Sequence, residues 1–118
     1  MSETILENNT LTLKLNCGKA SIKIIKELHE IFRSFIGEIK FFVLNIECLE
    51  EIDSNIYMEI FNIALLCSIN KIHFTVIDNL NTMKCDHCFL VQHENNLRCD
   101  ICFAKLIDII DDLNKCIT

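Results

Sequence analysis

Four of the eight cysteines lie in two C-x-x-C pairs that are close together in the sequence. Cys85 and Cys88 form the first pair, and Cys99 and Cys102 form the second after ten intervening residues. Each pair can offer two thiolates to one ion, and four thiolates at about 2.3 Å satisfy the tetrahedral preference of Zn²⁺. The spacing therefore predicts a structural zinc hairpin over residues 84–103, with these four cysteines as the ligands.

Other chemistry for these thiols is less well supported by the spacing. A thioredoxin-like motif carries one C-x-x-C pair that opens a helix after a strand, which is not the pattern here. A catalytic zinc ion needs an open coordination position, whereas four cysteines fill the shell, even without His87 or His93. A redox or metal sensor that releases zinc on oxidation stays as the alternative. The remaining cysteines are predicted to be small buried side chains; they are Cys17, Cys48, Cys67 and Cys116.

A second feature is the pair Asp53-Ser54, between a hydrophobic strand and a helix. Apolar residues recur at helical spacing from Ile56 to Cys67, and the segment from Ile72 to Ile77 is typical of a strand buried on both faces. Residues 41–78 are therefore predicted to form a parallel βαβ unit. The helix start offers free N–H groups to a phosphate or a partner carboxylate, and Asp, Ser and Asn are equally favoured there as simple caps.

The flanking segments complete a single α/β domain over residues 1–118. Residues 4–7 and 10–15 are predicted to pair as antiparallel strands around Asn8-Asn9, which tolerates the positive φ angles of a tight turn. Amphipathic patterns predict a helix that ends near residue 38 and a last helix over residues 103–116. Together these elements predict a mixed β-sheet flanked by α-helices, with the zinc hairpin inserted before the last helix.

The order of these elements and the segment Val43 to Ile56, V-L-N-I-E-C-L-E-E-I-D-S-N-I, resemble the STAS domain family over residues 4–80. The resemblance implies a STAS-like fold and a non-catalytic regulator of the anti-sigma factor antagonist type. It also implies docking on a signalling protein, such as a kinase or phosphatase, through the helix start: Asp53, Ser54, Asn55 and Tyr57. The family often has a phosphorylated Ser or Thr where this chain has Asn55, which leaves Ser54, one residue earlier, as the candidate acceptor.

Composition narrows the class of partner. The net charge of −6 opposes broad attraction to nucleic acid phosphates, so a protein partner is expected, and a homodimer stays open. Charged residues interrupt every apolar run before the roughly 20 residues of a membrane span, so no membrane segment is predicted. The first residues form no signal peptide, which predicts a cytoplasmic protein with reduced cysteines. No nucleophile and base pair or phosphate loop is recognisable, so no enzymatic activity is predicted.

Overall fold

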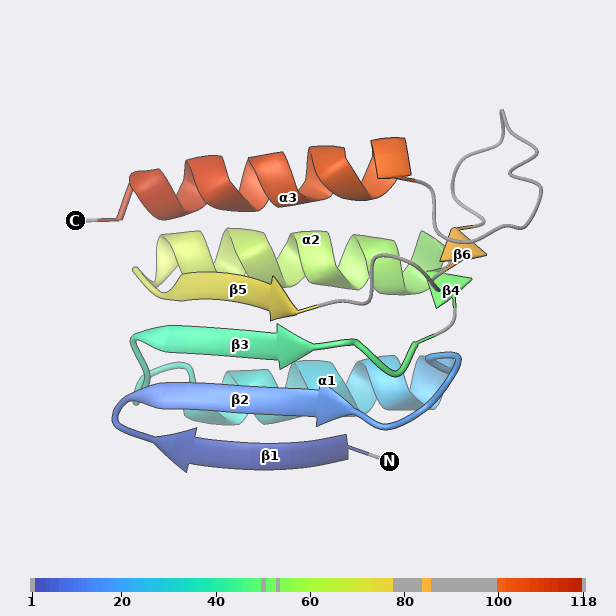
Figure 1. Ribbon diagram of the computed structural model, residues 1–118. Helices are drawn as coiled ribbons and strands as arrows, with labels where there is room; N and C mark the ends of the chain where they lie inside the picture. The colour runs from blue at the N-terminus through green and yellow to red at the C-terminus, as the bar shows by residue number, and fades with distance from the viewer. Residues whose placement is uncertain (1, 50, 53, 78–83, 86–99, 118) are drawn as a thin grey trace.

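The computed structural model describes residues 2–49, 51–52, 54–77, 84–85 and 100–117, and among these only the backbone of residues 51, 52, 54, 55, 57, 84, 85 and 100–106. The elements are β1 (Ser2–Glu7), β2 (Thr10–Leu15), α1 (Ile22–Phe35), β3 (Phe41–Asn45), β4 (Glu51–Ile52), α2 (Ser54–Ile69), β5 (His73–Ile77), β6 (Lys84–Cys85) and α3 (Asp100–Lys115). The protein is a mixed α/β fold, as predicted: a four-stranded sheet in the order β1-β2-β3-β5 with three helices (Figure 1).

The direction of the strands follows from the connections between them. β1 and β2 are antiparallel and are joined by Asn8 and Asn9, whose φ angles of 51° and 64° confirm the predicted tight turn. β2, β3 and β5 are parallel to one another because α1 and α2 return the chain to the starting edge of the sheet. The predicted βαβ unit is thus confirmed in β3, α2 and β5.

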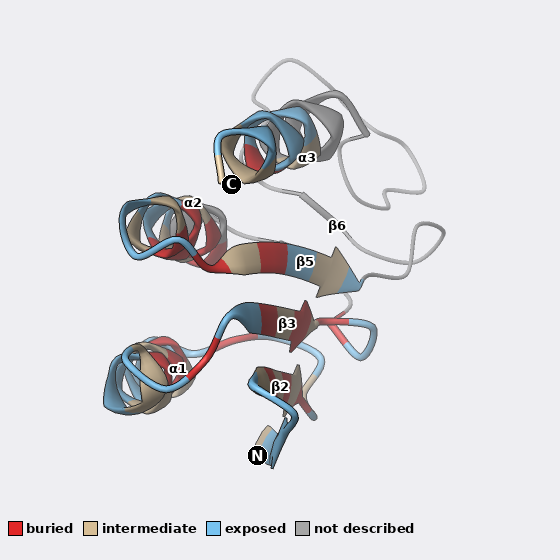
Figure 2. Cartoon of the chain, turned by 90° about the vertical axis from the view of Figure 1, so that its left-hand side faces the viewer, coloured by how far each residue is buried: buried red, intermediate tan, exposed pale blue. Residues whose placement is uncertain are grey.

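The core lies between the sheet and the two helices α1 and α2, which cover the same face (Figure 2). Alternate residues of β2 are buried against this layer, namely Leu11, Leu13 and Leu15. Phe42 lies at the centre of the core, because its ring centroid is 4.9 Å from that of Phe32 on α1 and 5.5 Å from that of Phe74 on β5. The contact between Phe32 and Phe42 holds α1 on the sheet.

The prediction that the strand over residues 72–77, which is β5, is buried on both faces is wrong. On β5, Phe74 is buried, whereas Thr75 and Ile77 are exposed. The reason is that α1 and α2 lie on one side, and no described helix covers the other side (Figure 2). Residues such as Thr12, Val43 and Thr75, which are register partners, therefore share an open face.

Several element boundaries differ from those predicted. α1 ends at Phe35, before residue 38, because the Ile36 and Glu38 amides bond to the carbonyl groups three residues earlier and tighten the turn. β1 begins at Ser2, two residues before its predicted start. α3 begins at Asp100, so residues 100–103 of the predicted zinc hairpin are helical. None of the described helices is long and apolar enough to cross a membrane.

The third helix protects an edge of the sheet instead of covering a face. α3 lies beside β5, and the side-chain amide of Asn114 bonds to the backbone of Phe74 in both directions. The Phe74 N–H donates to Asn114 Oδ1 over 3.0 Å, and Asn114 Nδ2 donates to the Phe74 carbonyl over 2.8 Å. Asn114 thus replaces a neighbouring strand at an edge that would otherwise be open to pairing with another chain.

Asn114→Ala is expected to lower the free energy of unfolding by about 1–3 kcal/mol, because it leaves a part-buried backbone donor and acceptor without their partner. Urea unfolding would measure the loss. Asp108→Ala, at an exposed position on the same helix, is the matched control and should change stability by no more than about 0.5 kcal/mol. Equal stability of Asn114→Ala and the parent protein would show that water replaces both hydrogen bonds.

Candidate docking site at the carboxyl edge of the sheet

The two helices α1 and α2 begin at the edge of the sheet where the parallel strands end (Figure 1). In open α/β sheets this edge is the usual place for binding, because loops and helix N-termini converge there. α2 begins at Ser54, as the sequence predicts, and the backbone of Asn55 and Tyr57 lies in its first turn. Asp53 lies outside the described residues. The backbone of the predicted site thus lies at a helix start. The side chains of its four residues are outside the described part of the structure.

A short parallel ladder connects this helix start to the cysteine motif. Glu51 pairs with Lys84, and Ile52 pairs with Cys85, so the first cysteine of the motif lies beside the strand that leads into α2. The two chemically distinctive segments are about thirty residues apart in the sequence. Sequence reasoning missed this contact, because strands of two residues have no periodicity that a pattern could reveal.

The zinc prediction falls largely outside the described part of the chain. The backbone of Cys85 lies in β6 and that of Cys102 in the first turn of α3, whereas Cys88 and Cys99 are outside the described residues. Both α2 and α3 begin on the side of the molecule where β4 and β6 lie (Figure 1). Among the side chains that the structure describes, no group of three or more His, Cys, Asp or Glu could hold a metal ion. The zinc site therefore stays a prediction from the spacing of the cysteines.

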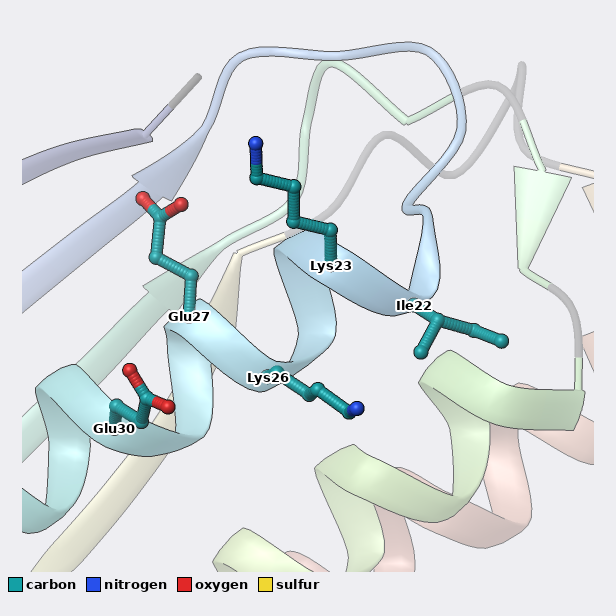
Figure 3. Close-up of a pocket in the computed structure, with 5 residues that line it drawn as sticks. All are labelled: Ile22, Lys23, Lys26, Glu27 and Glu30. Carbon is teal, nitrogen blue, oxygen red and sulfur yellow. The ribbon is translucent and has the colours of Figure 1, made fainter.

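Exposed apolar side chains surround the helix starts. Ile22, the first residue of α1, is 62% exposed, and Met58 in the second turn of α2 is 48% exposed. A shallow hollow of about 480 Å³ on α1 is lined by Ile22, Lys23, Lys26, Glu27 and Glu30. In Figure 3, Ile22 and Lys26 extend to the side of α1 on which α2 lies, whereas Glu27 extends to the other side. Glu27 accepts a hydrogen bond from Ser2 on β1 over 3.0 Å.

His29 and Glu59 hold α1 and α2 together next to this surface. His29 Nδ1 is 2.8 Å from Glu59 Oε2, and the two side chains are 32% and 13% exposed. His29 is a half-buried residue of α1, and Glu59 is its partner on α2. This contact joins α1 to α2.

The unpaired cysteines are more exposed than the sequence predicts. Cys67 is buried as expected, and burial raises the pKa of its thiol to about 12, so it is unreactive at neutral pH. Cys17 is half-buried, and its thiol pKa is raised by desolvation and then by the nearby Cys48. The prediction of burial is wrong for Cys48 and Cys116, which are exposed because they follow the ends of β3 and α3.

Comparison of the chain with models of protein families, with curated proteins and with solved structures found no match.

Proposed function

We propose that this protein is a non-catalytic regulatory domain of the STAS type, which docks on a signalling protein through the starts of α1 and α2. The observation that carries the proposal is the exposure of Ile22 and Met58 at two adjacent helix starts. We call Ile22, Lys26, Ser54 and Met58 the docking face. Large apolar side chains of this kind act as anchors in protein interfaces, where a few residues supply most of the binding energy.

Charge supports a partner with an acidic segment. Lys26 lies next to the exposed apolar residues, and the start of α2 is the positive end of that helix's dipole. A carboxylate or phosphate of the partner would be stabilised at this helix start, while an apolar side chain packs against Met58. The first turns of both α1 and α2 contain no acidic residue that would oppose such binding.

The proposed role of the zinc site is to hold the segment that borders the docking face. The ladder between β4 and β6 pairs Cys85 with Ile52, two residues before Ser54. If Cys85, Cys88, Cys99 and Cys102 bind Zn²⁺, the metal anchors β6 to the start of α3, and thereby supports the strand that leads into α2. This placement also supports the alternative function of a redox or metal sensor, because loss of the metal would reach the docking face through the same ladder.

Ser54→Asp and Met58→Asp are expected to change partner binding much more than stability. Met58→Asp places a charge on an exposed anchor and should weaken binding roughly tenfold or more. Ser54→Asp adds a negative charge at a helix N-terminus, which is tolerated or mildly favourable for the fold and repels an acidic segment of the partner. Leu65→Asp is the matched control, since Leu65 is 39% exposed on the same helix but distant from its start.

The test begins with affinity capture from native cells, using the parent protein and the three variants, and continues with titration of the captured protein. The proposal requires a partner that binds the parent and Leu65→Asp with similar dissociation constants and binds Met58→Asp far more weakly. A partner that binds all four proteins equally would remove the docking face from the interface. Binding that is unchanged in these three variants, but is lost in Cys99→Ser or after oxidation of the protein, would favour the sensor function.

A further inference from the structure

A hollow of about 550 Å³ lies at the amino-terminal ends of β3 and β5. The docking face is at the other end of these strands (Figure 1). The hollow is lined by Ile36, Gly37, Ile39, Lys40, Phe41, Asn70, Lys71, His73 and Ile117. These residues come from the ends of all three helices and the starts of two strands, so the fold brings them together from distant parts of the sequence. The volume is within the range of about 300–1,000 Å³ that is typical of sites for small molecules.

The charge of this hollow is opposite to that of the protein. Lys40 and Lys71 line it together with His73, and none of the lining residues that the structure describes is Asp or Glu, although the chain has a net charge of −6. Neither lysine forms an ion pair with any residue that the structure describes. Two unpaired ammonium groups close to one cavity create a local positive potential that attracts an anion.

The backbone geometry at the end of α2 fixes the position of Lys71. Lys71 has a φ angle of 57°, the left-handed conformation that favours glycine or asparagine. It ends α2 in a Schellman motif, because its N–H bonds to the Ser68 carbonyl over 3.2 Å and the Ile72 N–H bonds to the Cys67 carbonyl over 2.7 Å. These two bonds hold Lys71 just before the start of β5, where it lines the hollow.

The hollow also offers a flat apolar surface. The rings of Phe41 and His73 stack with centroids 5.5 Å apart and an angle of 21° between their planes, and Phe41 is 46% exposed. The N–H groups of Lys40, Phe41 and His73 are already bonded to backbone carbonyls. The lysine side chains can hold an anion in the hollow, while an aromatic group can pack against Phe41.

We infer that this hollow binds a small aromatic anion, a single ring that carries a phosphate or carboxylate group. Lys40 and Lys71 neutralise the anionic group, and Phe41 packs against the ring. The inference does not depend on the proposed docking function, because the two sites lie at opposite edges of the sheet and share no residue.

The test is a titration of the full chain with 4-fluorophenyl phosphate, followed by ¹⁹F NMR of the probe and by the amide signals of the protein. Binding should saturate and should shift the amides of Gly37, Lys40 and Lys71. Lys71→Asn keeps the left-handed conformation accessible and removes one cation, so it should weaken binding roughly fivefold to tenfold. Lys23→Asn, on the exposed face of α1, should leave binding unchanged.

Gly37→Glu tests the same site by another route. A Cβ atom at Gly37 meets no atom within 4 Å, and no described glycine has a positive φ angle, so the substitution is compatible with the fold. Its carboxylate should weaken binding of the aryl phosphate at least as much as Lys71→Asn does. The inference is overturned if the neutral probe 4-fluorobenzyl alcohol, or inorganic phosphate, binds the parent as tightly as 4-fluorophenyl phosphate does. It is also overturned if both variants bind 4-fluorophenyl phosphate with the affinity of the parent.

Discussion

The purified parent protein is expected to hold about one zinc ion per chain, and Cys99→Ser is expected to release it. Structural zinc sites in small peptides contribute about 10–16 kcal/mol of apparent binding free energy at neutral pH, so loss of one of four thiolates should have the largest effect of any single change. Lys84, Arg98 and Lys105 flank the cysteines in the sequence and can offset the net charge of about −2 at four thiolates and one divalent ion. Elemental analysis of freshly reduced protein measures the metal.

The fold should survive this loss, because the described residues of the sheet, α1 and α2 form a core of their own, with Phe32, Phe42 and Phe74 in contact. Hydrogen exchange should accelerate in residues 84–103 and remain slow in β3, α2 and β5. Cys48→Ser is the matched control, since Cys48 is an exposed cysteine outside the motif and its loss should leave the zinc content unchanged. Absence of metal in the reduced parent, with all four thiols reactive, would reject the zinc site and favour redox chemistry.

Phe42→Ala is expected to lower the free energy of unfolding by about 3–5 kcal/mol, a large part of the 5–15 kcal/mol that is typical of a domain. Phe42 is fully buried between Phe32 and Phe74, so its removal leaves a cavity and breaks two aromatic contacts. Because this core fixes α1 and α2 on the sheet, the variant should also lose binding at the docking face. Urea unfolding followed by circular dichroism measures the change.

The neighbouring residue offers a control of the same size. Phe41 lies on the opposite face of β3 and is 46% exposed, so Phe41→Ala should cost no more than about 1 kcal/mol. The same variant should lose affinity for the aryl phosphate, because Phe41 packs against its ring. Equal destabilisation by both substitutions would mean that the two faces of the sheet are covered alike, which contradicts the one-sided arrangement of α1 and α2.

The local elements of this protein were largely determined by its sequence. The strand over residues 10–15, the turn at Asn8-Asn9 and the start of α2 at Ser54 were all predicted correctly, because each depends on residues that are neighbours along the chain. The two C-x-x-C pairs are a similarly local signal, although they fall mostly outside the described residues. Patterns of this kind report how a segment folds and which chemistry it can carry.

Contacts between distant segments were decided only by the tertiary structure. Periodicity could not show that α1 and α2 cover one face and leave Thr75 and Ile77 exposed, since a run of apolar residues is the same whichever face is covered. Nor could it reveal the pairing of Ile52 with Cys85, or the side chain of Asn114 that occupies the edge of β5. Lys40 and Lys71 are ordinary surface lysines in the sequence. They face one hollow because a parallel crossover brings the end of α2 beside the start of β3.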